Sequence, residues 1–158
     1  MIIDDEARAY ERALNELKRI DHLIYVSLKY TRTVDVIRNI IERMLNAFDI
    51  VFDEILERAK KNEDIFEIPA APRLRCDLVR KMHKDDKQLA EFLDFYLLLR
   101  QFKNAEYTAQ QEFRRYVTMT ATFPNGEQQT LDIDKITQYY QIMKDFVAYV
   151  EHILEPKT

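Results

Sequence analysis

The three histidines are the residues best suited to reactive chemistry, and their spacing excludes the common metal sites of helical proteins. His22, His83 and His152 lie in separate segments, and none has a Glu or Asp three residues before it. The Glu-x-x-His pairs of ferritin-like di-iron bundles are therefore absent. No His-x-x-x-His pair exists either, which removes the usual helical zinc arrangement. We expect no metal site and no other cofactor.

Cys76 is the second candidate for chemistry. A nucleophilic cysteine needs a neighbouring base and a lowered pKa, and the nearest base in the sequence is His83, two helical turns away. A structural thiol is the favoured interpretation. A lone cysteine also excludes an intramolecular disulfide and a four-cysteine zinc site. Because the chain has no glycine-rich phosphate loop and no Cys-x-x-Cys pair, the sequence favours a non-enzymatic protein.

A locally basic stretch is the third candidate. Its members are Arg73, Arg75, Arg80, Lys81, His83 and Lys84, with Asp77 as the opposing charge. Arginines in such a stretch could neutralise the phosphates of a nucleic acid. The alternative is an exposed helix face beside the acidic NED and KDD segments, which would cancel much of its field. A second basic point, Arg114 and Arg115, is expected where a helix becomes a hairpin, and these arginines could equally cap helix carbonyls.

Length and composition limit the possible architectures. The chain has 158 residues, which suits a single domain over residues 1–158. Its net charge of −4 is mild, so a nucleic-acid-binding role would depend on a local patch. No run of 18 apolar residues appears, and the first residues are acidic where a signal peptide would be basic. We therefore expect a soluble, cytoplasmic protein without a membrane partner.

Apolar residues recur at steps of three and four along most of the chain, which predicts an up-and-down bundle of four long helices and one short helix. The expected long helices cover about 5–30, 34–59, 85–116 and 134–154, and the short helix covers 73–84. Near the end of the first helix, Leu23, Tyr25 and Val26 widen the apolar stripe and predict burial on more than one side. Thr33, Asp85, and either Asp132 or Asp134 are the expected N-caps.

One β-hairpin is predicted near residues 117–133. Val117, Met119, Ala121 and Phe123 alternate with threonines, and the sequence PNG supplies a turn at Asn125 and Gly126. An isolated hairpin is marginal in water, so its apolar face must pack on the helices or on another chain.

A helical chain of this size is similar, in general shape only, to the HEPN ribonuclease and nucleotide-binding domains. Those domains carry an arginine followed four to six residues later by a histidine. Here Arg19 and Arg80 each precede a histidine by three residues, so no catalytic role is transferred.

The first functional hypothesis is a non-enzymatic interaction protein. Such a protein would either form a homodimer, joined through a helix face or through the hairpin, or bind another protein. The alternative is a nucleic-acid-associated module that uses the basic residues named above.

Overall fold

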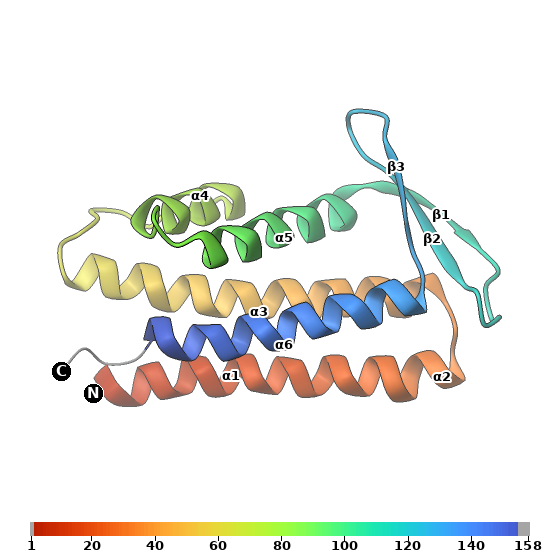
Figure 1. Cartoon of the computed structure of the whole chain (residues 1–158), viewed down its shortest axis with the longest axis horizontal. Helices are drawn as coiled ribbons and strands as arrows, with labels where there is room; N and C mark the ends of the chain where they lie inside the picture. The colour runs from red at the N-terminus through yellow and green to blue at the C-terminus, as the bar shows by residue number, and fades with distance from the viewer. Residues whose placement is uncertain (1, 155–158) are drawn as a thin grey trace.

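The computed structural model describes residues 2–154, with side chains described from residue 8 onward. It is an up-and-down helical bundle with a small antiparallel sheet at one end (Figure 1). The elements are, in chain order, α1 (Ile2–His22), the π-helix η1 (Leu23–Ser27), α2 (Leu28–Tyr30), α3 (Val34–Lys61), α4 (Pro72–Met82), α5 (Lys87–Asn104), β1 (Glu106–Gln110), β2 (Thr118–Thr122), β3 (Gln128–Leu131) and α6 (Ile133–Leu154). The predicted fold class, with α4 as the short helix, is confirmed.

Helix α3 is the central element of the bundle and contacts α1, α4, α5 and α6. It matches the predicted helix over 34–59 and runs two residues further, to Lys61. Its stripe is buried because apolar residues three and four apart share one face of a helix. Phe48 lies at the centre, stacked on Phe146 of α6 at 4.1 Å and tilted against Tyr96 of α5 at 5.2 Å between ring centroids. This aromatic cluster joins three helices that are distant in sequence.

The first rod contains a π-helical segment that the sequence pattern does not predict. Helix α1 continues through η1 into α2 and stops at Tyr30. Within η1 only Ile24 is buried, whereas Tyr25 is 53% and Val26 40% exposed. The prediction that this end is buried on more than one side was wrong for Tyr25 and Val26, whereas Leu23 packs partly buried against the core. Tyr25 contacts the buried ring of Tyr140 edge-on, with ring centroids 6.4 Å apart, and leaves about half of its own side chain exposed.

The predicted helix over 85–116 was wrong from residue 105 onward. Helix α5 ends at Asn104, and Ala105 is extended, with φ −77° and ψ 150°. Residues 106–110 then form β1, whose five residues are all exposed. The spacing of Ala109, Phe113 and Tyr116 looked like a continuation of the helical stripe. Pairing of this threonine-containing segment with β2 replaces that helix, so Arg114 and Arg115 lie in the β1–β2 loop and not at a helix end.

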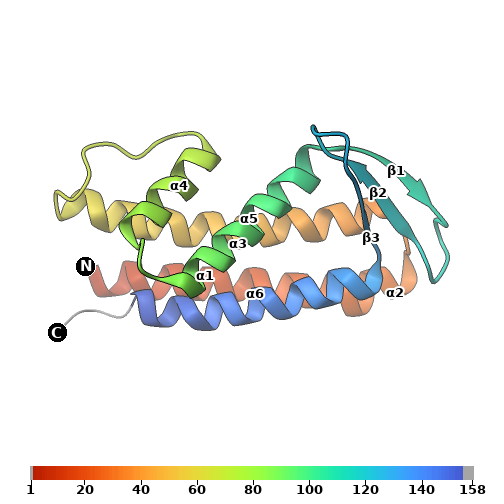
Figure 2. The same cartoon turned by 45° about the horizontal axis from the view of Figure 1, so that its top comes forward.

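The predicted hairpin exists as β2 and β3, and β1 extends it to a three-stranded sheet in the order β1-β2-β3 (Figure 2). Met119 pairs with Leu131, and both are buried on the face that meets the helices. Gly126 in the turn has a φ of +86°, a left-handed angle that glycine adopts without steric cost. Phe123 anchors the turn because its ring packs on Phe102 of α5 at 5.1 Å.

Side-chain caps define three helix starts. The Thr33 hydroxyl accepts a hydrogen bond from the Val36 N–H at 3.3 Å, and Asp132 accepts one from the Lys135 N–H at 2.8 Å. The prediction of Asp85 as the third cap was wrong by one residue, because Asp86 accepts from the Leu89 N–H at 2.9 Å. Across residues 2–154, no helix has both the length and the apolar character needed to span a membrane.

Candidate functional site

The arginines of α4 are partly used to hold this helix against the bundle. Arg75 contacts the carboxylate of Asp53 on α3, and Arg80 donates to Asp94 on α5 at 2.7 Å. Both guanidiniums are partly buried, with 21% and 34% of the side chain exposed. Each pair links α4 to a neighbouring helix through a partly exposed contact. The predicted basic face therefore presents fewer unpaired cations than its sequence contains.

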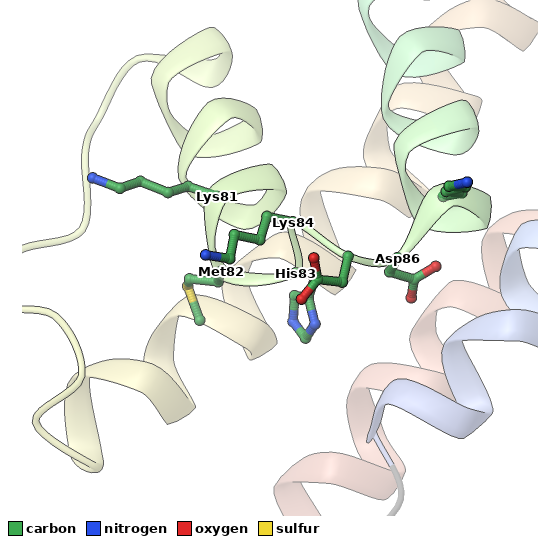
Figure 3. Close-up of a pocket in the computed structure, with 7 residues that line it drawn as sticks. Lys81, Met82, His83, Lys84 and Asp86 are labelled. Carbon is green, nitrogen blue, oxygen red and sulfur yellow. The ribbon is translucent and has the colours of Figure 1, made fainter.

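Lys81, His83 and Lys84 lie at the corner between α4 and α5. With Asp85 and Asp86 they line a shallow hollow of about 690 Å³ (Figure 3). The hollow is built almost entirely from one short segment, residues 81–87, and mixes lysines with carboxylates. A mixed, open surface of this kind offers neither a focused field nor an enclosed volume for a ligand.

Asp86 has a structural role in that corner. One of its carboxylate oxygens caps α5, and the other accepts a hydrogen bond from the Tyr149 hydroxyl on α6. Burial alone would raise the pKa of Asp86, but the hydrogen bonds from Tyr149 and from the Leu89 N–H lower it overall. Burial and the same carboxylate raise the pKa of Tyr149 to about 12. A phenol with that pKa is a poor acid or base near neutral pH, so the contact serves to tie α6 to the start of α5.

Arg73 lies apart from the other α4 cations. It lines a groove of about 690 Å³ between the start of α4, the end of α5 and the β2–β3 turn. Arg100, Gln101 and Phe123 lie on the same groove. Among the residues described, no carboxylate forms an ion pair with Arg73 or Arg100. The site residues predicted on α4 are thus divided among two paired arginines, one hollow and one groove.

Cys76 is fully buried, and burial raises its pKa to about 11. Its thiol lies 4.0 Å from the Leu93 carbonyl oxygen of α5. Because the thiolate is the nucleophilic form, a thiol with this pKa is inert at neutral pH. The structural interpretation of Cys76 agrees with this environment. Among the side chains that the structure describes, from residue 8 to residue 154, no three His, Cys, Asp or Glu residues gather in a way that could hold a metal ion.

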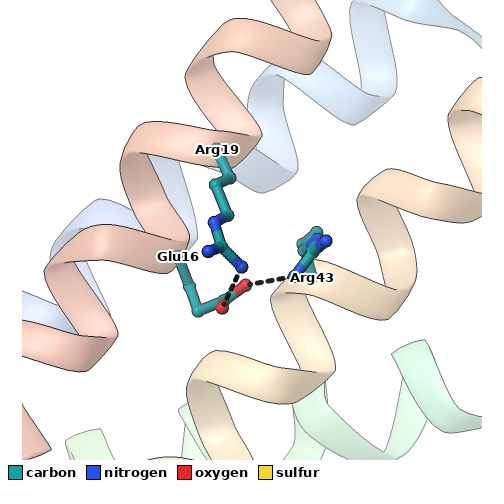
Figure 4. Close-up of polar contacts among 3 residues, drawn as sticks. All are labelled: Glu16, Arg19 and Arg43. Carbon is teal, nitrogen blue, oxygen red and sulfur yellow. Dashed lines mark hydrogen bonds and ion pairs between the residues drawn. The ribbon is translucent and has the colours of Figure 1, made fainter.

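Glu16 is a buried acidic residue, 8% exposed, at the contact between α1 and α3. It pairs with Arg19 of its own helix at 3.4 Å and with Arg43 of α3 at 3.6 Å (Figure 4). Two cations on one carboxylate compensate the cost of removing that charge from water. This triad links α1 to α3, and the two arginines lie within ion-pair distance of its carboxylate, whose Oε2 is buried without a hydrogen-bond partner among the described residues.

Arg114 and Arg115 belong to a surface of different character. We call residues 29–32 and 113–116 the aromatic end, after the exposed rings of Tyr30, Phe113 and Tyr116. A hydrogen bond from the Phe113 N–H to the carbonyl oxygen of Arg32, at 2.6 Å, joins the two segments. This surface lies at the sheet end of the bundle, far from α4 in both views (Figures 1 and 2).

The aromatic end was missed at the sequence level as a unit. The expected helices place Lys-Tyr-Thr-Arg where the helix over 5–30 ends, and they place Phe-Arg-Arg-Tyr at the end of the helix over 85–116. The available signal was that both tetrapeptides place rings directly beside cations and contain no acidic residue. Their approach in space depends on the turn after β1, which the helical interpretation had removed.

Strand β1 is the remaining exposed feature. It is an edge of the sheet, and its sequence Glu-Tyr-Thr-Ala-Gln contains no lysine, no proline and no bulge against β2. Edge strands of natural proteins usually carry such features because they block pairing with another chain. Comparison with protein-family models, curated proteins and solved structures found no match to this chain.

Proposed function

We propose that this chain is a non-enzymatic interaction protein that forms a homodimer through the outer edge of β1. The observation that carries the proposal is the exposure of all five β1 residues at an edge that has no lysine, no proline and no bulge. An unpaired edge offers a row of backbone N–H and C=O groups to an incoming strand.

The residues of β1 suit pairing with a second copy of the same strand. In an antiparallel, two-fold pairing centred on Thr108, each Thr108 lies opposite its own counterpart. Tyr107 then faces Ala109, and Glu106 faces Gln110. No like charges meet across this interface, and the threonine pair is a favourable cross-strand combination. The two sheets would join into one of six strands.

The long helices offer less to a second copy. Their apolar stripes are buried inside the chain, above all on α3, where the residues of the stripe are nearly inaccessible. Of the two dimer surfaces that the sequence suggested, the sheet is therefore the better supported.

The test is sedimentation or light scattering over a range of concentrations, with Thr108→Lys as the disrupting variant. Two lysines would meet at the two-fold centre, so the dimer should dissociate. Thr130→Lys on β3, which is also an exposed position on an edge strand, is the matched control and should remain dimeric. An equimolar mixture of Thr108→Lys and Thr108→Glu should restore a dimer. A wild-type monomer at all concentrations, or loss of the dimer only in Thr130→Lys, would refute the β1 interface.

Nucleic-acid association is the second candidate function. It is favoured by the gathering of unpaired cations and exposed rings at the aromatic end. The original prediction for the α4 cations has a separate test, because removing Arg75 and Arg80 should weaken RNA or DNA binding if that face is the site.

A further inference from the structure

The aromatic end concentrates exposed rings and positive charge within eight residues. Residues 29–32 and 113–116 contain four cations, three aromatic rings and no carboxylate. Tyr30 is 79% exposed, Phe113 75% and Tyr116 64%. The whole chain has 24 basic and 28 acidic residues, which gives −4, so this positive patch stands out against an acidic molecule. Such a patch is complementary to an anionic partner.

The surface is held in place by specific contacts. Besides the hydrogen bond between Phe113 and Arg32, the Glu112 carboxylate accepts from the Val34 N–H at 3.2 Å, at the start of α3. Gln111 and Phe113 have positive φ angles of 55° and 66°, which are costly for residues other than glycine. These contacts therefore hold Phe113 outward in a strained conformation. Strain of this kind is characteristic of functional surfaces.

The cations of the aromatic end are available to a ligand. No described carboxylate lies within ion-pair distance of Arg114 or Arg115. The Arg115 guanidinium lies 5.5 Å from the centre of the Tyr116 ring, a cation–π contact that keeps ring and charge together. Glu112, the nearest acidic neighbour of the loop cations, is already engaged by α3.

The alternation of rings and cations indicates what kind of anion fits. Proteins that bind single-stranded nucleic acid combine aromatic rings, on which bases stack, with cations that neutralise the phosphates between them. Aromatic residues and arginine are also enriched in protein–protein interfaces, so the experiments below include an acidic peptide as a competing partner. A membrane-inserting loop would also need more aliphatic surface than this one has. We propose that the aromatic end binds single-stranded nucleic acid, with Tyr30, Phe113 and Tyr116 stacking on bases and Arg114 and Arg115 contacting phosphates.

The electrostatic part of the proposal is tested by a salt titration. Fluorescence anisotropy is measured with labelled oligothymidylate and oligouridylate of about twelve nucleotides, a length within the usual site sizes. Each phosphate contact to a single strand contributes about 0.7 to the slope of log affinity against log salt, so Arg114→Gln with Arg115→Gln should reduce the slope by about 1.4. Lys81→Gln with Lys84→Gln removes the same charge from the α4 corner and should leave the slope unchanged.

The stacking part is tested by replacing rings with leucine. Phe113→Leu and Tyr116→Leu keep an apolar side chain and remove the flat π face. Each should weaken oligonucleotide binding at least about 5-fold, because stacking on one ring contributes roughly 1–3 kcal/mol, equivalent to about 5- to 150-fold in affinity. Tyr30→Leu, in the segment 29–32, should also weaken oligonucleotide binding. Circular dichroism melts of all variants establish that they are folded.

Other partners give distinguishable results. Tighter binding to an oligoglutamate peptide, or to vesicles of phosphatidylcholine and phosphatidylserine, would overturn the proposal in favour of an acidic protein or a membrane. The proposal would also be overturned if the protein bound duplex DNA as tightly as the single-stranded oligonucleotides and the leucine variants did not weaken that binding. A protein that binds no oligonucleotide even at low salt would overturn it as well. Because Thr108→Lys should bind the oligonucleotide like wild type, this proposal and the homodimer can fail independently.

Discussion

Arg75 and Arg80 of α4 contact carboxylates on the neighbouring helices, whereas Arg114 and Arg115 of the β1–β2 loop lie among exposed aromatic rings with no carboxylate partner among the described residues. The two regions look alike in sequence, since each is a short stretch rich in arginine. Their difference arises from what lies opposite. Helix α4 lies across α3 and α5, which present Asp53 and Asp94, while the loop projects from the end of the bundle.

The comparison shows that a count of charges does not identify a binding surface. Lys and Arg next to acidic residues in space are screened and geometrically fixed, whatever the local sequence suggests. Cations that lie beside rings and have no carboxylate in an ion pair keep more of their attraction for an external anion. The basic helix is thus better understood as part of the bundle, and the aromatic end as part of its accessible surface.

The largest expected effect separates buried and exposed aromatic residues near the sheet. Phe123 is 4% exposed and packs on Phe102, whereas Phe113 is 75% exposed. Phe123→Ala should lower the free energy of unfolding by about 3–5 kcal/mol, because it leaves a cavity beneath the β2–β3 turn. Phe113→Ala should change it by less than about 0.5 kcal/mol. Urea denaturation followed by circular dichroism measures both. If both variants lost the same free energy of unfolding, Phe113 would be a core residue and the aromatic end would not differ from the packed part of the sheet.

A smaller effect tests the arginines directly. Replacing both Arg75 and Arg80 with alanine removes two partly exposed ion pairs, which together should cost about 1 kcal/mol of unfolding free energy. Replacing both Arg114 and Arg115 with alanine should leave the unfolding midpoint unchanged. High salt should narrow the difference between the first variant and wild type, since it screens the pairs. If the variant lacking Arg114 and Arg115 were less stable than the variant lacking Arg75 and Arg80, the loop arginines and not the α4 arginines would be the ones that support the fold.

The helical part of the fold could be predicted from the sequence because its stripes are long and regular. The pattern on α3 spans the whole helix, and its period leaves no other arrangement. The end of α5 could not be predicted in the same way. Ala109, Phe113 and Tyr116 continue the helical spacing by chance, and only tertiary pairing of residues 106–110 with β2 decides for a strand. Local pattern and long-range pairing conflict at this one boundary.

The sequence was sufficient to identify single candidate residues, but it was not sufficient to show which of them lie together in space. The sequence identified the basic members of α4 and the pair Arg114 and Arg115, yet it could not show that Asp53 and Asp94 would reach across from other helices. It also could not bring Tyr30 near Phe113, because the hydrogen bond that joins their segments links Arg32 to Phe113, which are 81 positions apart, about half the chain. Contacts at that separation depend on the fold as a whole.

The smallest expected effect addresses why Phe113 occupies its strained position. A left-handed angle costs an L-residue roughly 1–2 kcal/mol, whereas glycine loses only its own extra chain entropy, about 0.5–1 kcal/mol. Phe113→Gly should therefore stabilise the fold by about 0.5–1 kcal/mol, while oligonucleotide binding falls as in Phe113→Leu. A variant that is more stable but binds the oligonucleotide more weakly would mean that the strained backbone serves to keep the Phe113 ring exposed for binding. A destabilised Phe113→Gly variant would instead mean that the ring supports the loop, and the aromatic end would then resemble α4, with its side chains serving the fold.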